Sequence, residues 1–361
     1  MPVIGADFRR FGNDLVNAVP IEDCPPVHEI FDVLPIFSID GNQLTQPFVK
    51  IFPDHKAQTL GFCDPLQDNT IEAEEDVRKF RYEELSSTHT IANKADDTLS
   101  SCRDPNGVQT QIAIQKILQT LAGQLEFGQA ANNEVSGFLE QCDPNKVINK
   151  DCGFLTKTDL LQALQMVTVG SGGCQFFAGN IVAELAFFKA HWVENFNVEF
   201  AKREFCCLTG QRVLKQVPKF RNAEFVRMDE WKVQPCQIVG DGDARKIQKI
   251  GEPVQLPPAE IIKQMHQGVI FSANLVVFTA GWNAANLIAP AEFGPRIFRY
   301  RETEKPERSH NRMTVFLPIN LAVQSKCSCA VIRDLVPAPD NIIVIPPNGN
   351  GPVIAHAVKQ F

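Results

Sequence analysis

Cysteine and histidine are the residues of this chain whose chemistry is most open to catalysis or metal binding. The 361 residues include 11 cysteines and 7 histidines. Cys327 and Cys329 lie in an apolar run, where both side chains would share one face of a strand. A zinc site would need a second close pair at ligand spacing, and the adjacent Cys206 and Cys207 do not supply it. The sequence therefore predicts no metal site and no cofactor.

The histidines form no catalytic pattern. None stands in an HExxH, HxH or HxxxH arrangement, which zinc catalysis favours. His191 lies among aromatic residues in FFKAHW, which is typical of a core or interface histidine. Because both residue types are plentiful, the Cys–His pair of a hydrolase stays open as an alternative, although no local signature supports it. We therefore expect no catalytic residue and no enzyme activity.

Two glycine-containing stretches have the composition of ligand-binding loops. Residues 170–173 read GSGG but lack the lysine of a phosphate-binding loop, and no GxGxxG motif follows a strand-like run. Asp241 and Asp243 flank Gly242, but calcium needs about 6–8 oxygen ligands. The sequence therefore favours a hinge at 170–173 and a hairpin turn at 240–243.

Composition and charge restrict the class of protein. Hydrophobic residues make up 44% of the chain, enough to bury a core, and the net charge is -7. A protein that grips nucleic acid over a broad face is normally basic, whereas an acidic surface can face packaged DNA without adhering to it. No apolar stretch approaches the ~18 residues of a membrane span, and no secretory signal is visible. We therefore expect free thiols in a reducing cytoplasm and no membrane partner.

Two charged segments are candidates for contacts between molecules. The first is an acidic run, Glu72, Glu74, Glu75 and Asp76. The second is a basic cluster interleaved with aromatic residues, Arg296, Arg299, Arg301, Lys305, Arg308 and Arg312. Either can be a solvated face, and the basic cluster could also meet phosphate, although three glutamates between its members cancel part of its field. We interpret the two segments as ion partners on neighbouring subunits.

The segment around the acidic run cannot build a core of its own. Strand-like runs at Ile30–Ile39 and Gln46–Phe52 flank the turn residues Asp40–Gly41–Asn42. From His55 to about Leu85 the chain is polar. It still holds isolated large apolar residues, Phe52, Phe62, Phe80 and Tyr82. Long structureless loops inside compact domains are uncommon, so this composition predicts a long hairpin that lies on another surface.

A long amphipathic helix is the clearest element of the sequence. Asp104 and Pro105 suit its start, because aspartate accepts from free amides and proline fits the first helical position. One apolar stripe follows at helical spacing, Ile114, Ile117, Leu118, Leu121 and Leu125. We predict a helix over 105–131, with a second helical piece at 131–140.

Further helical patterns give way to strands. Thr156 and Asp159 predict a capping box for a helix to about Val167, and residues 175–200 read as one apolar-rich helix or two short ones. A short helix is expected at Glu260–His266. Strand-like runs dominate from about 203 to 335: Glu204–Leu208, Arg212–Val217, Glu224–Arg227, Gln234–Val239, Val269–Phe278, Arg296–Arg301 and Thr314–Ile332. The predicted fold class is α+β.

The order of these parts resembles the HK97-fold major capsid family of tailed phages and encapsulins. The stretch VLPIFSIDGNQLTQPFVKIFP is similar to the family's lead into an extended hairpin, the E-loop. NNEVSGFLEQC and GFLTKTDLLQAL resemble its passage from the spine helix into the A-domain, and NRMTVFLPINLAVQSKCSCAVIRDL resembles its late strand pair. The chain departs from the family in its high cysteine count and in lacking a clear N-terminal scaffold domain.

The resemblance implies an HK97-like division of the chain into six parts. These are an N-terminal arm with the strand that leads into the E-loop (1–42), the E-loop (43–95), the spine helix with part of the P-domain (96–155), the A-domain (156–310), the returning P-domain strands (311–336) and a C-terminal arm (337–361).

The resemblance also implies a function. It is that of a major capsid protein, which assembles in the host cytoplasm as pentamers and hexamers. These would form the icosahedral shell of a virion, and the shell would enclose double-stranded DNA without sequence-specific binding. Scaffolding, portal and cement or decoration proteins would be its partners. An encapsulin-like compartment and a Cys-dependent hydrolase remain as alternatives. The residues expected at subunit interfaces are Phe62, Glu72, Glu74, Glu75, Asp76, Phe80, Tyr82, Arg296, Arg299, Arg301 and Arg308.

Overall fold

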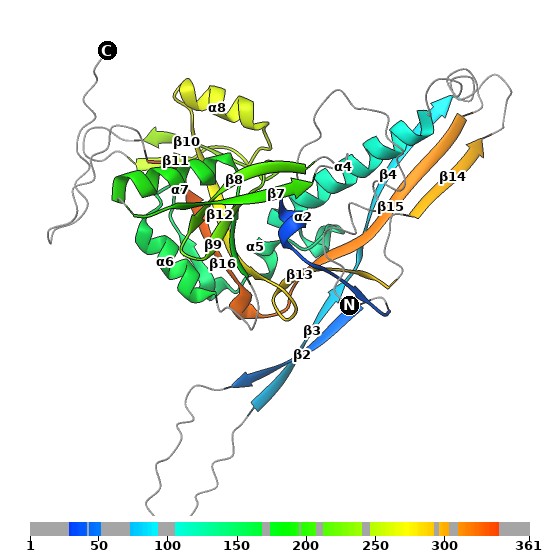
Figure 1. The fold of residues 1–361 in the computed structure, drawn as a ribbon, viewed down its shortest axis with the longest axis horizontal. Helices are drawn as coiled ribbons and strands as arrows, with labels where there is room; N and C mark the ends of the chain where they lie inside the picture. Colours follow the sequence, from blue (N-terminus) through cyan, green and yellow to red (C-terminus); the bar gives the residue numbers. More distant parts are fainter. Residues whose placement is uncertain are drawn as a thin grey trace, which may run out of the picture.

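The protein is a rounded body with two projections (Figure 1). The structure is a computed structural model that describes residues 29–41, 43–51, 73–92, 105–167, 174–194, 196–206, 212–239, 246–291, 296–302 and 310–338. The expected N-terminal arm before residue 29, the hinge at 170–173, the turn at 240–243 and nearly all of the expected C-terminal arm lie outside these residues.

The body is built on a sheet around one long strand, β12 (Ile270–Ala280). β12 pairs antiparallel with β6 (Cys174–Gly179) on one side and with β16 (Cys329–Leu335) on the other. β5 (Val147–Asn149) adds a parallel strand to β16. Beyond β6 the sheet continues through three more strands, β9 (Ala223–Arg227), β8 (Arg212–Phe220) and β7 (Glu199–Cys206).

Both faces of the sheet are buried at its centre, along β6 and β12. Along β6, Phe177 belongs to the apolar cluster under α6 (Lys157–Met166) and α7 (Ile181–Glu194), and Phe176 belongs to the cluster on the opposite face. Side chains alternate between the faces of a strand, so a strand covered on both sides reads as a continuous apolar run. The predicted helix over 175–200 is therefore wrong: it begins as β6, and only α7 is helical.

Short polar side chains fix where the body helices begin. The Thr156 hydroxyl accepts from the amide of Asp159, and the Asp159 carboxylate accepts from the amide of Thr156 at 2.8 Å. The predicted capping box is confirmed, and α6 starts directly after it. Asn180 does the same for α7, since its Oδ1 accepts from the amides of Val182 and Ala183 at 3.1 Å each. Such caps typically contribute about 1 kcal/mol to stability.

The long helix α4 (Pro105–Phe127) connects the body with the larger projection (Figure 1). It spans about 34 Å at 1.5 Å per residue. The predicted apolar stripe is confirmed, because all five of its residues are buried. The helix packs on β4 (Glu83–Ala92) and β15 (His310–Val323). It ends before the predicted residue 131, because the chain turns back and the amide of Gly137 donates to the carbonyl of Gly128 at 2.8 Å.

The larger projection is a ribbon of three antiparallel strands, β4, β15 and β14 (Arg296–Glu302), with β15 in the middle. Residues Asn320–Val323 at the end of β15 pair instead with β13 (Ala285–Pro290), which belongs to the body. One strand is therefore shared between ribbon and body. The predicted run Thr314–Ile332 is two strands, β15 and β16.

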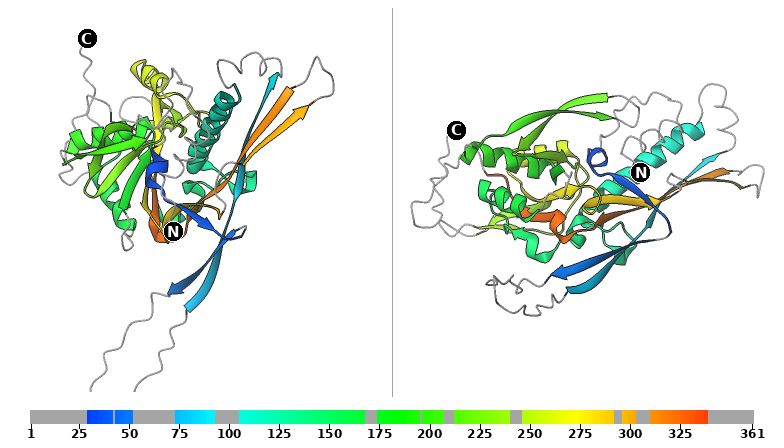
Figure 2. Two further views of the ribbon diagram at one scale, coloured as in Figure 1. Left: turned by 45° about the vertical axis from the view of Figure 1, so that its right-hand side comes forward. Right: turned by 60° about the horizontal axis from the view of Figure 1, so that its bottom comes forward.

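The second projection is an arm of two strands, β2 (Gln43–Ile51) and β3 (Ala73–Arg81). They form a separate antiparallel sheet, with Gln43 opposite Arg81 and Ile51 opposite Ala73. The arm extends from the base of the ribbon away from the body (Figure 2).

Smaller elements complete the described chain. The predicted strand Ile30–Ile39 is a short helix, α2 (Ile30–Val33), followed by β1 (Ile36–Ile39), which lies parallel to β13. The predicted helix at 260–266 is confirmed as α8 (Pro258–His266). The remaining elements are α5 (Phe138–Gln141), β10 (Gln234–Val239), β11 (Lys246–Lys249) and short 3-10 helices at Ala130–Asn132, Pro144–Lys146 and Lys326–Ser328.

The tight return after α4 can be tested with two alanine substitutions. A Cβ on Gly128 would collide with the carbonyl oxygens of Val135 and Gln124, whereas a Cβ on Gly123 would have Glu230 O as its nearest atom, at 3.6 Å. We expect Gly128→Ala to lower the free energy of unfolding by about 2 kcal/mol or more, because backbone must move. Gly123→Ala, the matched control, should raise it by about 0.5–1 kcal/mol. Chemical denaturation of the subunit measures both, and equal stabilities would contradict this packing.

Candidate assembly surfaces

The β2–β3 arm is anchored to its own chain at its base. Phe80 is only 9% exposed and packs with Ile288 of β13 and Ala322 of β15. The Tyr82 hydroxyl lies 3.2 Å from Ile39 O and 3.1 Å from Ala289 O, where it donates to these carbonyls. Phe80 and Tyr82 therefore hold the arm to the body within one chain, a role that the sequence prediction of subunit contacts did not give them.

Beyond this base, the arm has no sheet neighbour among the described residues. β2 pairs only with β3 there, and no other described strand joins them. A two-stranded sheet alone is marginally stable in water, and its open edges can pair with another chain. The arm is therefore a surface that another molecule can cover.

The two charged segments of the sequence lie on different projections. Glu74, Glu75 and Asp76 are on β3, opposite Lys50, Val49 and Phe48 of β2. The basic segment lies mainly on β14, in the ribbon (Figure 1). Its described members are Arg296, Arg299 and Arg301 on β14 and Arg312 on β15, and the expected interface residues Phe62, Glu72 and Arg308 lie outside the described residues. The described parts of the two segments lie on different projections of one chain, so a pairing between these parts would join two molecules.

Large apolar side chains are exposed on the body. Phe200 of β7 is 57% exposed and Leu214 of β8 is 60% exposed. Trp282, between β12 and β13, is 53% exposed and touches Phe37 of β1 edge to face, with ring centroids 4.9 Å apart. Scattered exposed apolar residues are normal. Here Phe200 and Leu214 share the outermost hairpin of the sheet, and β7 has no further strand beside it among the described residues.

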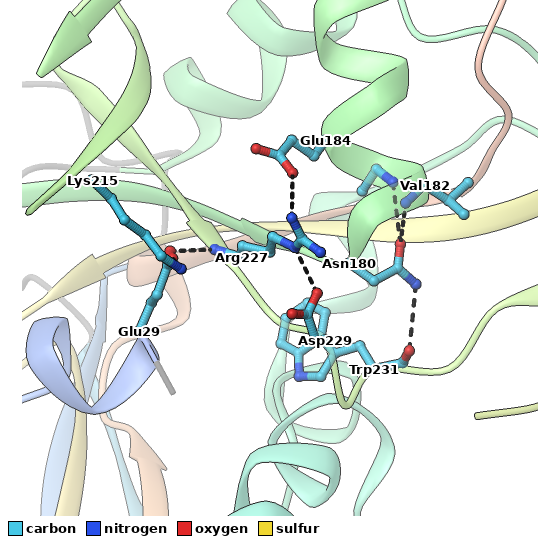
Figure 3. A network of polar contacts seen from close by, with 9 residues as sticks. Glu29, Asn180, Val182, Glu184, Lys215, Arg227, Asp229 and Trp231 are labelled. Atoms are coloured by element: carbon cyan, nitrogen blue, oxygen red, sulfur yellow. Dashed lines mark hydrogen bonds and ion pairs between the residues drawn. The ribbon is translucent and has the colours of Figure 1, made fainter. Parts of the chain in front are cut away.

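A charged network joins the N-terminal segment to the body (Figure 3). Glu29, directly before α2, is buried and accepts from Lys215 Nζ and from the amide of Arg227, each at 2.9 Å. The Arg227 guanidinium in turn contacts Asp229 at 2.6 Å and Glu184 of α7 at 3.8 Å. These bonds tie α2 to β8, β9 and α7, so the chain is fixed to the body before it reaches the arm.

Two buried polar residues join α4 to the body. Trp231 Nε1 donates to Ala122 O at 3.0 Å. Glu126 is fully buried, and its carboxylate accepts from the amide of Lys232 at 2.9 Å and from Asn274 Nδ2 of β12 at 3.0 Å. Sequence reasoning missed this joint, although Glu126 stands four residues after buried Ala122 and so continues the buried face of the helix.

Groups that a hydrolase would use are not assembled among the described residues. Cys142 Sγ donates to Cys329 O at 3.4 Å, and no thiol described in the structure is hydrogen-bonded to an imidazole. A polar cavity of about 330 Å³ lies beside the C-terminal end of α4, and neither cysteine nor histidine lines it. Within the described ranges, no three histidine, cysteine or acidic side chains gather as metal ligands. No described helix has the length and apolarity to cross a bilayer.

The chain resembles solved shell structures over most of its length. The SrpI encapsulin of Synechococcus elongatus PCC 7942 matches with a TM-score of 0.59 at 11% identity, over 91% of this chain and 95% of that one. The capsid of a native GTA particle matches with a TM-score of 0.50 at 11% identity, over 90% and 97%. The chain has the HK97-type shell fold. No family model matches the sequence, and no curated protein matches it.

The HK97-type fold accounts for the order of elements that the sequence predicted. The β2–β3 arm stands where the E-loop was expected, and α4 stands where the spine helix was expected. The six domain boundaries stay a prediction. β4, which falls within the predicted E-loop range 43–95, pairs with β15 and not with β3.

The joint at Glu126 should make the stability of this HK97-type subunit depend on pH. Burial raises the pKa of Glu126 to about 8, with the bonds from Asn274 and Lys232 opposing the shift. The folded state then keeps a proton that the unfolded state loses near pH 4.5. The free energy of unfolding should therefore fall as pH rises from about 4.5 to 8, by up to about 1.4 kcal/mol per unit from this group.

Glu126→Gln should flatten this dependence, because an amide does not titrate. Denaturation midpoints of the unassembled subunit between pH 5 and 8 measure the effect. Glu140→Gln on α5, which replaces an exposed carboxylate, should keep the wild-type slope. A Glu126→Gln protein with the same slope as wild type would show that Glu126 does not titrate in this range.

Proposed function

We propose that this chain is the major capsid protein of a tailed bacteriophage, which assembles through its arm, ribbon and body edges into the icosahedral shell around double-stranded DNA. The observation that carries the proposal is the β2–β3 arm on an HK97-type body, since its two strands have no further sheet neighbour among the described residues. Such a surface is useful only when another molecule covers it.

Repetition of weak contacts would give the shell its strength. An extended arm that lies across an adjacent subunit adds main-chain and apolar contacts of only modest energy each. In a closed symmetric assembly every subunit makes several such contacts at once, so the whole is far more stable than one pair. The exposed Phe200 and Leu214 at the outer hairpin of the body offer a further contact of the same kind.

The net negative charge of the chain is compatible with a shell that encloses DNA. The chain has 42 acidic and 35 basic residues, so its overall field repels a polyanion and does not favour broad binding of phosphate. We propose that the subunit encloses DNA without reading its sequence, and that scaffolding, portal and decoration proteins take part in assembly. We also propose that it has no catalytic role.

An encapsulin-like compartment is the second candidate. The observation that favours it is the TM-score of 0.59 with the SrpI encapsulin, against 0.50 with the GTA capsid. The two candidates differ in what the particle contains. A phage capsid should need co-expressed phage proteins and hold nuclease-protected DNA, whereas an encapsulin should close around protein cargo.

Negative-stain microscopy of the recombinant protein, alone and with its neighbouring genes, tests the proposal. We expect closed particles of uniform size in at least one condition, and protected double-stranded DNA in particles made with the packaging proteins. A protein that stays monomeric in every condition would overturn the shell proposal, and uniform particles filled with protein would select the second candidate.

A charge-exchange experiment tests the contact between the two projections. Changing Glu74, Glu75 and Asp76 to lysine should place like charges opposite the basic β14 segment of a neighbour and reduce particle yield about tenfold or more. Changing Arg296, Arg299 and Arg301 to glutamate should do the same. Combining both sets should restore assembly, because the charges are then exchanged.

Two further measurements keep this experiment decisive. Circular dichroism should show that each variant subunit is folded. Reversal of Glu252 and Glu260, acidic residues beside and on α8, should leave particle yield unchanged. Normal shells both from the variant with only the lysine substitutions and from the variant with only the glutamate substitutions would show that these segments do not pair.

A further inference from the structure

Cys152 and Cys236 bring two buried sulfur atoms into contact inside the body. The two Sγ atoms are 3.3 Å apart, although the residues lie 84 positions apart in the sequence. Both side chains are buried, at 4% and 5% exposure, in a small apolar cluster with Val336. A disulfide bond is about 2.04 Å long, so a relative shift of about 1.3 Å would bring these atoms to bonding distance.

Backbone bonds hold each cysteine in place. Cys152 lies in a tight turn with a φ of 64°, and its amide donates to Asp334 O at 2.9 Å. Cys236 lies on β10, between Lys249 of β11 and Ile270 of β12. The contact between the sulfur atoms is therefore set by two separate pieces of sheet structure and not by loose side chains.

We propose that Cys152–Cys236 is a covalent modification site at which an intramolecular disulfide forms after the protein meets an oxidising environment. The oxidant is a small disulfide of the glutathione class. One protein thiolate attacks it and releases one small thiol, and the second protein thiol then displaces the other. Two S–H bonds are lost and one S–S bond forms in the protein, while the two electrons and two protons reduce the oxidant to two thiols.

The surroundings explain why the reduced pair would persist in the cell. Burial, together with the neighbouring sulfur of Cys236, raises the pKa of Cys152 to about 12. A thiol attacks disulfides as the thiolate, so this one reacts slowly near neutral pH. Reducing cytoplasm would keep both thiols free, and slow exchange outside the cell would join them.

The bond would close a large loop of the body. The chain between Cys152 and Cys236 includes α6, β6, α7 and the β7–β8–β9 sheet region. A cross-link that closes a long loop restricts the unfolded chain, and this raises stability most when the native geometry needs little change. The contact between the two sulfur atoms does not depend on the proposed function. The time at which they are oxidised does depend on it, since a capsid is made in the cytoplasm and then released.

Peptide mapping of the intact subunit tests the site. Purified protein is kept with reduced or oxidised glutathione, then unfolded, alkylated and digested without reductant. We expect a linked peptide pair that carries Cys152 and Cys236 only after oxidation, two hydrogen masses lighter than the separate peptides. Full alkylation of both residues after oxidation, or linkage only between other cysteines, would overturn the proposal.

Thermal unfolding gives a second readout. Oxidised wild-type protein should unfold roughly 5 °C higher than the same protein with reductant added, and Cys236→Ser should lose this difference. Cys174→Ser, which removes an exposed thiol at the start of β6, is the matched control and should keep it. If Cys236→Ser fails to fold, the peptide map of wild-type protein still shows whether the Cys152–Cys236 disulfide forms. Particle formation is scored separately by microscopy, so failure of the disulfide and failure of the shell proposal are distinguishable.

Discussion

The backbone ladder along β15 is the interaction on which the extended half of the molecule depends. Its first part is bonded to β4 and β14, and its last residues are bonded to β13 in the body. Among the described elements the ribbon is held to the rest of the chain by this strand and by the helix α4 that packs on it. Backbone hydrogen bonds lose little when the sheet is solvated on one face, which lets a thin structure extend from the body.

Where α4 meets the body the polar groups are buried, so each of them needs a hydrogen-bond partner. Glu126 accepts from Asn274 there and Trp231 donates to the carbonyl of Ala122, and a buried polar group left without a partner typically costs about 1–3 kcal/mol. Specific geometry is therefore imposed where α4 meets the body.

The sequence allowed a good part of this architecture to be predicted, for reasons that are local. The stripe from Ile114 to Leu125 and the capping box at Thr156 depend on residues within a few positions of one another, and both predictions are confirmed. The interval 175–200 was predicted wrongly, since a strand buried on both faces has the same apolar composition as a buried helix. The contacts of Phe80 and Tyr82 could not be predicted from the sequence, because their partners, Ile288 and Ala289, lie more than 200 residues away.

The return of the chain after α4 has a consequence for how shells of this type can vary. Gly128 and Gly137 bring two backbone segments so close that a side chain on either would collide with carbonyl oxygens. Insertion of a further helical turn in α4 would shift that crossing by about 5 Å along the helix axis relative to the preceding part of the helix. The length of α4 at this end is therefore restricted by the crossing at Gly128 and Gly137 and by the bond between Glu126 and Asn274.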